Sequence, residues 1–150
     1  QASIGVAQME RAKQLVSERH TLAKIYNEAL KKLDFFQLPF ENNDYEHGYQ
    51  SFPCVFDINN ANLNNIKLVS EKRNAFMDVL QNEGTATRPA THAVHMIQYY
   101  REKYQLQPED FPNAYIANEC SISFPMFNGL LKKEQDYVIN KINENIKCVA

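Results

Sequence analysis

The first 33 residues contain no proline and a single glycine, and their apolar side chains recur at intervals of three, four and seven residues. This spacing is typical of one amphipathic helix. Its apolar face is formed by Leu15, Leu22, Ile25, Tyr26, Ala29, Leu30 and Leu33. Thirty helical residues span about 45 Å, whereas a compact domain of this length has a radius of gyration of about 15 Å. The helix therefore overhangs its domain or runs along a junction with another part of the protein.

The start of this helix favours the second reading. The sequence opens directly on helical residues without an initiator methionine. Its first turns carry Ile4, Val6, Ala7 and Met9, which are apolar enough to require a partner. We therefore expect the chain to be a piece of a longer protein.

Composition narrows the class of protein. A chain of 150 residues with 44% hydrophobic and 23% charged residues suits one soluble globular domain with a sizeable core. A net charge of −2 without a basic run argues against nucleic acid and anionic membranes as partners. No apolar run approaches the roughly 18 residues of a membrane span, and no signal peptide is recognisable. Cys54, Cys120 and Cys148 are far apart and form no CxxC pair, which predicts reduced thiols in a cytoplasmic protein.

Strand and helix patterns alternate along the rest of the chain. The expected elements are a strand over 48–58, a helix over 71–82, a strand over 85–88, a helix from about 94, a helix over 113–119, a strand over 120–124 and a helix over 132–146. Pro53 favours an edge position or a bulge, Ser70 is a plausible N-cap, and Gly84 suits a left-handed helix stop. The expected buried face of the helix over 71–82 is Ala75, Phe76, Val79 and Leu80, and the apolar stripe of the last helix is Tyr137, Val138, Ile142 and Ile146. This order predicts an α+β two-layer sandwich, in which a small, mainly antiparallel sheet of about three strands lies beneath several helices.

The most chemically promising stretch is GTATRPATHAVHMIQYY, residues 84–100, which places Arg88, His92 and His95 within eight residues. Pro89 fixes its own φ and pushes Arg88 towards extended geometry, so a helix is not expected to run through this point. A guanidinium beside two imidazoles suits an anionic group or a proton in transit. A surface loop with satisfied histidines is the structural alternative.

No self-contained catalytic set emerges from the residues. His92 and His95 can share a helical face, but a metal site needs a further ligand, for which only Glu102 offers itself. Cys54 and Cys120 fall in apparent strand cores, which disfavours a nucleophilic role. The four glycines form no phosphate-binding loop. We therefore assign no catalytic residue and no metal ligand; a metal enzyme using His92 and His95 stays open and predicts stoichiometric zinc.

Four segments, in this order, carry a family resemblance: QASIGVAQMERAKQLVSERHTLAKIYNEAL, HGYQSFPCVFDI, RNAFMDVLQNEGTATRPATHAVHMIQYYREKY and DFPNAYIANECSISFPMFNGLLKKEQDYVINKINENI. Together they resemble the C-terminal part of the DegT/DnrJ/EryC1/StrS family of sugar aminotransferases. The last segment is similar to the family's ending, FP.A…A…LSLPLYPGLT.ED.DYVI..I. The resemblance covers nearly the whole chain.

The resemblance implies a pyridoxal phosphate (PLP) enzyme of polysaccharide biosynthesis that moves an amino group from glutamate or glutamine to a keto sugar, commonly nucleotide-linked. In this family the lysine that binds the cofactor lies in a large N-terminal domain. Residues 1–33 would then link to that missing domain, and residues 34–150 would form the small C-terminal domain. Alone, this part would bind no PLP and be inactive; the full protein would be a cytoplasmic homodimer with its active site near the dimer interface.

The resemblance also suggests substrate-binding residues. His95 matches the family histidine that faces the active site, and Arg88 and His92 share its loop, although TRPATH departs from the plainer family pattern. Tyr49 and Gln50 match the aromatic–polar pair that begins the family's strand; their structural alternatives are a core tyrosine and a solvated edge residue. Because some relatives are regulators, a non-catalytic sensor or a module that dimerises through residues 1–33 is the alternative function.

Overall fold

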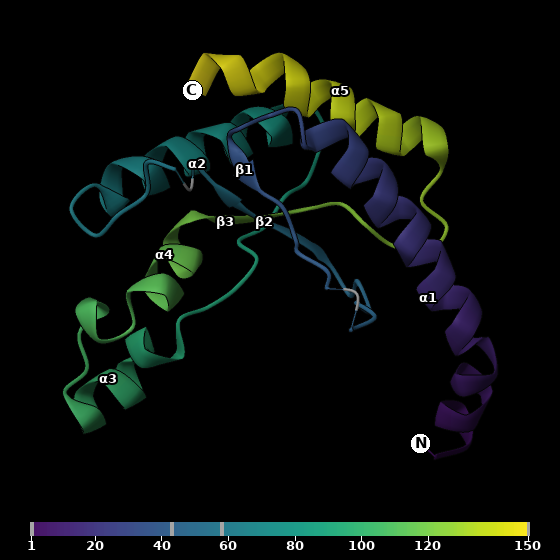
Figure 1. The fold of residues 1–150 in the computed structure, drawn as a ribbon, viewed down its shortest axis with the longest axis horizontal. Coiled ribbons are helices and arrows are strands. Elements are labelled where there is room, and N and C mark those ends of the chain that lie inside the picture. The colour runs from purple at the N-terminus through teal and green to yellow at the C-terminus, as the bar shows by residue number, and fades with distance from the viewer. Residues whose placement is uncertain (1, 43, 58, 150) are drawn as a thin grey trace.

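A computed structural model describes residues 2–42, 44–57 and 59–149. In chain order its elements are α1 (Ala2–Leu30), β1 (Phe36–Gln37), β2 (Phe52–Phe56), α2 (Ile66–Asn82), the 3-10 turn η1 (Val94–Met96), α3 (Gln98–Tyr104), the 3-10 turn η2 (Pro108–Asp110), α4 (Pro112–Cys120), β3 (Ser121–Phe124) and α5 (Lys132–Val149). Figure 1 shows the sheet at the centre with α2 and α5 along one side, while α3 and the start of α1 extend away from α5. The predicted α+β fold is confirmed.

The sheet has the predicted size and direction but not the predicted strands. Its order is β1-β2-β3, and both pairings are antiparallel. The strand expected over 85–88 is reduced to a single bridge, in which Ser123 N donates to Arg88 O at 2.7 Å. Pro89 follows directly and has no N–H, so the pairing does not extend along the chain. The sheet has three strands because the two-residue β1, which the sequence pattern did not predict, pairs with β2.

Pro53 does not lie on an edge strand, because β2 is the middle strand of the sheet. The prediction of an edge position was therefore wrong at the level of strand order. Its physical basis is nevertheless visible: β1 pairs only with Val55 and Phe56, whereas Pro53 lies opposite Ser123 of β3. The imino acid thus falls beyond the short β1 ladder, where its missing N–H disrupts none of the β1 pairing.

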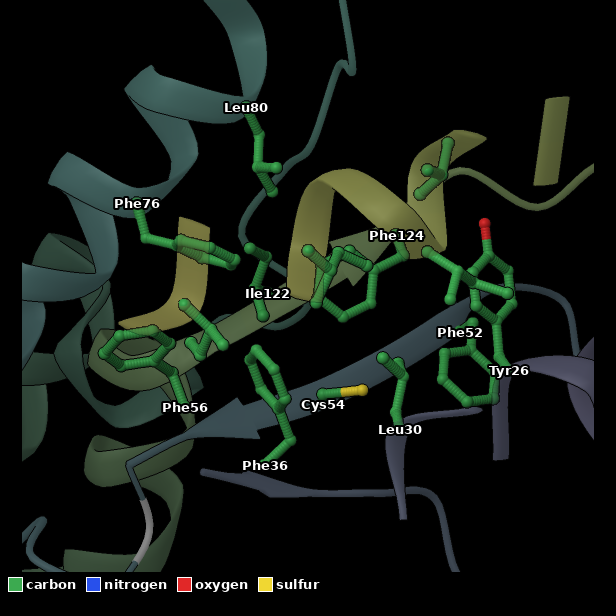
Figure 2. Packing of buried hydrophobic residues seen from close by; sticks show 14 of the residues in the cluster. Tyr26, Leu30, Phe36, Phe52, Cys54, Phe56, Phe76, Leu80, Ile122 and Phe124 are labelled. Carbon is green, nitrogen blue, oxygen red and sulfur yellow. The ribbon is translucent and has the colours of Figure 1, made fainter. Parts of the chain in front are cut away.

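The core is built from aromatic side chains of α1, α2 and all three strands. Figure 2 shows these rings facing a common interior. The ring centroids of Tyr26 and Phe52 are 5.0 Å apart, and those of Phe56 and Phe76 are 5.8 Å apart. The Tyr26 hydroxyl donates to Pro125 O at 2.7 Å, so this buried polar group is satisfied. Packing of large buried rings therefore holds α1 and α2 against the strands.

The long first helix is confirmed, and its two halves differ. Leu22, Tyr26 and Leu30 are buried against the core, as the spacing predicted. Residues 2–11 are all exposed, and Ile4 and Met9 expose 67% and 72% of their surface. The helix therefore leaves its domain about halfway along, as the first of the two alternatives expected.

The second helix starts earlier than expected. It begins at Ile66 after Asn65, so Ser70 is a buried residue inside the helix and not its N-cap. Ile66 and Val69 both reach the core, and their burial extends the helix towards the asparagine-rich loop. The stop is as predicted, because Gly84 follows the helix with a φ of +75°.

Two side chains that were expected to be buried lie at the surface. Ala75 on α2 is exposed, and Tyr137 on α5 is 47% exposed, with its hydroxyl donating to Glu83 O at 2.9 Å. Val138, Ile142 and Ile146 form the buried stripe of α5 as predicted. Each helix therefore faces the sheet along a narrower stripe than the full set of its apolar residues.

Cys54 and Cys120 are buried free thiols. Burial raises the pKa of both, that of Cys120 to about 11, so each is protonated at neutral pH. The prediction for Cys148 concerns a side chain outside the described residues. Among the helices of the described ranges, not one combines the length and apolar character that crossing a membrane requires.

Candidate functional site

Three of the candidate residues lie in the histidine-bearing loop, residues 83–96, which runs from the end of α2 through η1. Arg88 is fixed by its backbone pairing with Ser123 and exposes its side chain. His92 is exposed, whereas His95 in η1 is only 6% exposed. The extended backbone at Arg88 agrees with the prediction from Pro89, and the short 3-10 turn replaces the start of the expected helix.

His95 has an unusual environment. Its ring centroid lies 5.1 Å from that of Phe111, and its buried Nε2 has no hydrogen-bond partner among the described residues. A buried polar atom without a partner is destabilising, and such atoms often mark positions that a ligand, an ion or a water molecule completes. Of the five candidate residues, His95 is therefore the one with a buried polar atom that lacks a hydrogen-bond partner within the described residues.

The two histidines border the same hollow, called here the His95 hollow, with a volume of about 460 Å³. Its lining residues are His92, Val94, His95, Tyr100, Tyr104, Leu106, Phe111 and Ala114. The lining is aromatic and apolar apart from the imidazoles and the tyrosine hydroxyls, a composition typical of small-molecule sites. Arg88, Tyr49 and Gln50 do not line this hollow. The structure thus unites two of the five candidates.

Tyr49 and Gln50 lie in the turn before β2. Tyr49 is buried with a φ of +41°, and its ring centroid lies 4.2 Å from that of His47 and 5.2 Å from that of His20. Burial and the Glu41 carboxylate, which accepts a hydrogen bond from its hydroxyl at 3.2 Å, raise the pKa of Tyr49. Tyr49 is thus a core side chain, as its structural alternative expected, while Gln50 is exposed.

Arg19 on α1 is a residue that the sequence reasoning missed. Its Nη1 donates to Tyr49 O at 2.9 Å and to Gln50 O at 2.6 Å, and its Nε donates to Asn128 Oδ1 at 2.9 Å. The signal for it was available: Arg19 follows Leu15 by four residues and precedes Leu22 by three, which places a guanidinium on the apolar face of the helix. It joins α1 to the turn that carries two candidates.

A metal site was not assigned from the sequence, and zinc at His92 and His95 stayed an alternative. Within the described residues, no three His, Cys, Asp or Glu side chains lie close enough to share a metal ion. The His95 hollow also contains no carboxylate or thiol among its lining residues. The aromatic and apolar lining around two imidazoles suits an organic ligand that can also hydrogen-bond to imidazole.

Comparison with known proteins finds relatives that match nearly the whole chain. The model of the DegT/DnrJ/EryC1/StrS aminotransferase family matches residues 1–143. An uncharacterised protein of Methanocaldococcus jannaschii is 30% identical over 150 residues, covering 100% of this chain and 36% of the relative. GDP-perosamine synthase of Escherichia coli O157:H7 is 28% identical over 146 residues, covering 95% of this chain and 35% of the synthase. The chain thus spans about a third of the length of these curated relatives.

The fold of the chain is also similar to that of solved structures. The Spr1654 protein of Streptococcus pneumoniae in its PMP-form superposes with a TM-score of 0.82 at 20% identity, over 99% of this chain and 35% of that protein. Its PLP-form superposes with a TM-score of 0.81. At this identity the likeness shows the fold alone. Because the family model matches almost the entire sequence, the chain belongs to the DegT/DnrJ/EryC1/StrS aminotransferase family.

Proposed function

We propose that this chain is the small C-terminal domain of a PLP-dependent enzyme that transfers an amino group from glutamate or glutamine to a nucleotide-linked keto sugar. Residues 34–150 form that domain, and residues 1–33, which include α1, lead to a large N-terminal domain. The observation that carries the proposal is the family match over residues 1–143 in a chain that covers 36% of its M. jannaschii relative. The relative GDP-perosamine synthase supports a nucleotide-linked substrate.

The lysines of this chain do not suit covalent attachment of PLP. Lys72 and Lys141 are half-buried, the others are exposed, and none lines the His95 hollow. When bound, PLP supplies the electron sink for amino-group chemistry. The proposal therefore assigns PLP, and the lysine that binds it, to the domain outside this sequence. The described residues supply one wall of the site and carry out no step of the reaction alone.

The residues of this wall have distinct roles in the proposal. His95 offers its unpaired Nε2 to a polar group of the substrate, and His92 offers a second imidazole at the rim of the same hollow. Arg88, exposed on the same loop, binds a substrate carboxylate or phosphate through its planar fork of donors. Gln50 contributes a polar side chain from the turn that Arg19 holds, while Tyr49 supports that turn from inside.

The exposed apolar surfaces support a larger assembly. The first turns of α1 expose Ile4, Val6 and Met9, which the large domain or the second subunit of a homodimer covers in the proposed protein. The same surface favours the alternative function, a non-catalytic sensor or a module that dimerises through this helix. We place either protein in the cytoplasm on the basis of its unpaired buried thiols.

The test is to express the longer protein that contains this sequence, including the residues that precede Gln1. The enzyme proposal predicts a lysine positioned for the cofactor, absorbance from lysine-bound PLP, and transfer of the amino group of glutamate to a nucleotide-linked keto sugar. The 150-residue chain alone serves as the control and is expected to show neither absorbance nor transfer. A longer protein in which another residue replaces that lysine, and which shows no PLP absorbance, contradicts the enzyme and favours the sensor.

A further inference from the structure

The loop that carries the histidines is attached to the α4–β3 junction by side chains. Ala90 N and Thr91 N donate to the Ser121 hydroxyl oxygen at 3.1 and 3.3 Å. Ala93 N donates to Asn118 Oδ1 at 2.9 Å. Residues 89–93 form neither helix nor strand, so these amide groups depend on side-chain acceptors. Two side chains therefore satisfy three backbone donors just before η1.

Both acceptors have further contacts of their own. Ser121 is buried at the start of β3, and its carbonyl accepts a hydrogen bond from Arg73 Nη1 of α2 at 2.9 Å. Its Cα lies opposite that of Val55 in the central strand. Asn118 is half-buried on α4, where its Nδ2 donates to Glu119 Oε1 at 2.7 Å. Through Ser121 the loop is therefore connected to the sheet and to α2, and through Asn118 it is connected to α4.

We propose that Ser121 and Asn118 are positioning residues for the histidine-bearing loop: they hold residues 90–93 so that His95 stays buried against Phe111 at the wall of the His95 hollow. Their relevance to substrate binding rests on the proposed function, whereas the positioning itself is a property of this chain. Neither residue lines the hollow, so both act through the backbone that precedes His95.

Ser123 provides a matched control on the same strand. It lies two residues after Ser121 and is half-buried, and its side chain makes no hydrogen bond within the described ranges. Its pairing with Arg88 uses backbone atoms only, so it survives replacement by alanine. Ser121→Ala and Ser123→Ala remove the same hydroxyl group from neighbouring positions, and only the first removes an acceptor for the loop.

The first test is amide hydrogen exchange on the 150-residue chain, resolved by residue with NMR. Ser121→Ala is expected to raise the exchange rates of Ala90 and Thr91 about tenfold, whereas Ser123→Ala leaves them unchanged. Asn118→Ala is expected to do the same to Ala93. Core amides such as that of Phe76 report global stability and provide the correction for it. Unchanged exchange of Ala90 and Thr91 in Ser121→Ala overturns the proposal.

The second test reads the histidine itself. Diethyl pyrocarbonate modifies accessible imidazoles, so exposed His92 is an internal reference for buried His95. We expect the His95-to-His92 rate ratio to rise about tenfold in Ser121→Ala and in Asn118→Ala, and to stay at its wild-type value in Ser123→Ala. Should the ratio stay constant in all three variants, the loop does not need these side chains to hold His95, and the proposal fails.

Failure of the positioning role can be distinguished from failure of the proposed function. Both readouts use the isolated chain and require neither PLP nor substrate. A longer protein without transaminase activity, combined with the expected exchange and modification results, removes the enzyme and supports the positioning role. An active longer protein combined with unchanged exchange in Ser121→Ala supports the enzyme and overturns the positioning role.

Discussion

The sheet region and residues 94–111, from η1 to the N-cap of α4, use aromatic residues in opposite ways. In the sheet region, rings from helices and strands distant in sequence pack on one another, and Phe76 is fully buried. In the other region the rings lie on short elements and face outwards. The exposed large side chains there are Val94, Ile97, Tyr99, Tyr100, Tyr104 and Phe111. The same residue type thus stabilises one region and borders the His95 hollow in the other.

This difference separates the parts of the chain that are stabilised by contacts within it from the parts that leave apolar side chains exposed. Burial of rings within one chain contributes to folding, whereas rings that the chain leaves exposed are available to a ligand or another protein surface. The first half of α1 belongs with the second class, and Figure 1 shows it and α3 both extending away from α5. Contacts contained within the chain should therefore carry its stability, whereas the exposed side chains should contribute little to it.

The largest expected effect is the loss of a core ring. Phe76→Ala leaves a cavity among Phe36, Phe56 and their neighbours and is expected to lower the free energy of unfolding by about 4 kcal/mol. Phe111→Ala removes the same atoms from a side chain that is 52% exposed and is expected to cost less than about 1 kcal/mol. Urea denaturation of both variants is the measurement; equal losses would erase the distinction between the regions.

Next in size is the removal of the Arg19 guanidinium. Arg19→Ala breaks the bonds to Tyr49 O, Gln50 O and Asn128, and we expect a loss of about 2 kcal/mol in unfolding free energy. Arg11→Ala on the exposed half of the same helix is the matched charge control, expected within about 0.5 kcal/mol of wild type. An Arg19 variant as stable as the Arg11 variant would show that the contacts are dispensable.

A pH effect follows from the buried thiols. Burial raises the pKa of Cys120 to about 11, above its ordinary value of 9.0, so the folded state keeps a proton that the unfolded chain releases. This contribution to stability is complete below pH 9 and is lost as the pH rises towards 11, by about 1 to 2 kcal/mol. Unfolding free energies measured between pH 8 and pH 11 should decline less steeply in Cys120→Ala. An identical slope in the variant would refute this origin.

The smallest expected effect belongs to the overhanging turns of α1. Replacing Met9 by serine removes an apolar side chain that touches little of the domain, and the unfolding free energy is expected to change by less than about 0.5 kcal/mol. Analytical ultracentrifugation measures self-association of the 150-residue chain, which should be weaker in the variant than in the wild type, or absent in both. Marked destabilisation of the monomer would place Met9 among the self-contained contacts.

Regular elements with a long apolar period were predictable, and short or irregular ones were not. The face of α1 and the stripe of α5 follow from spacing alone, since many residues repeat the same signal. β1 has only two residues, too few for any alternation to appear. Ser70 resembled a cap by type, but the burial of Ile66 and Val69 moved the start of α2 upstream.

The candidate site shows the same division. The residues around Pro89 indicated a loop with Arg88, His92 and His95, and the loop is present. That His95 is buried with an unpaired Nε2 while His92 is exposed depends on α3, α4 and Phe111, which meet the loop only in three dimensions. Ser121 and Asn118 gave no signal, because a serine in a strand pattern and an asparagine in a helix are unremarkable until a distant amide reaches them.

The order of residues by itself determined the α+β class, the overhanging first helix and the family, because these depend on periodicity and on motifs that lie within short spans of the chain. Tertiary structure alone decided which strand is central, which histidine is buried and which side chains hold the loop. Such outcomes depend on contacts between residues far apart in sequence, whose geometry is set by the burial of the shared aromatic core and not by any local pattern.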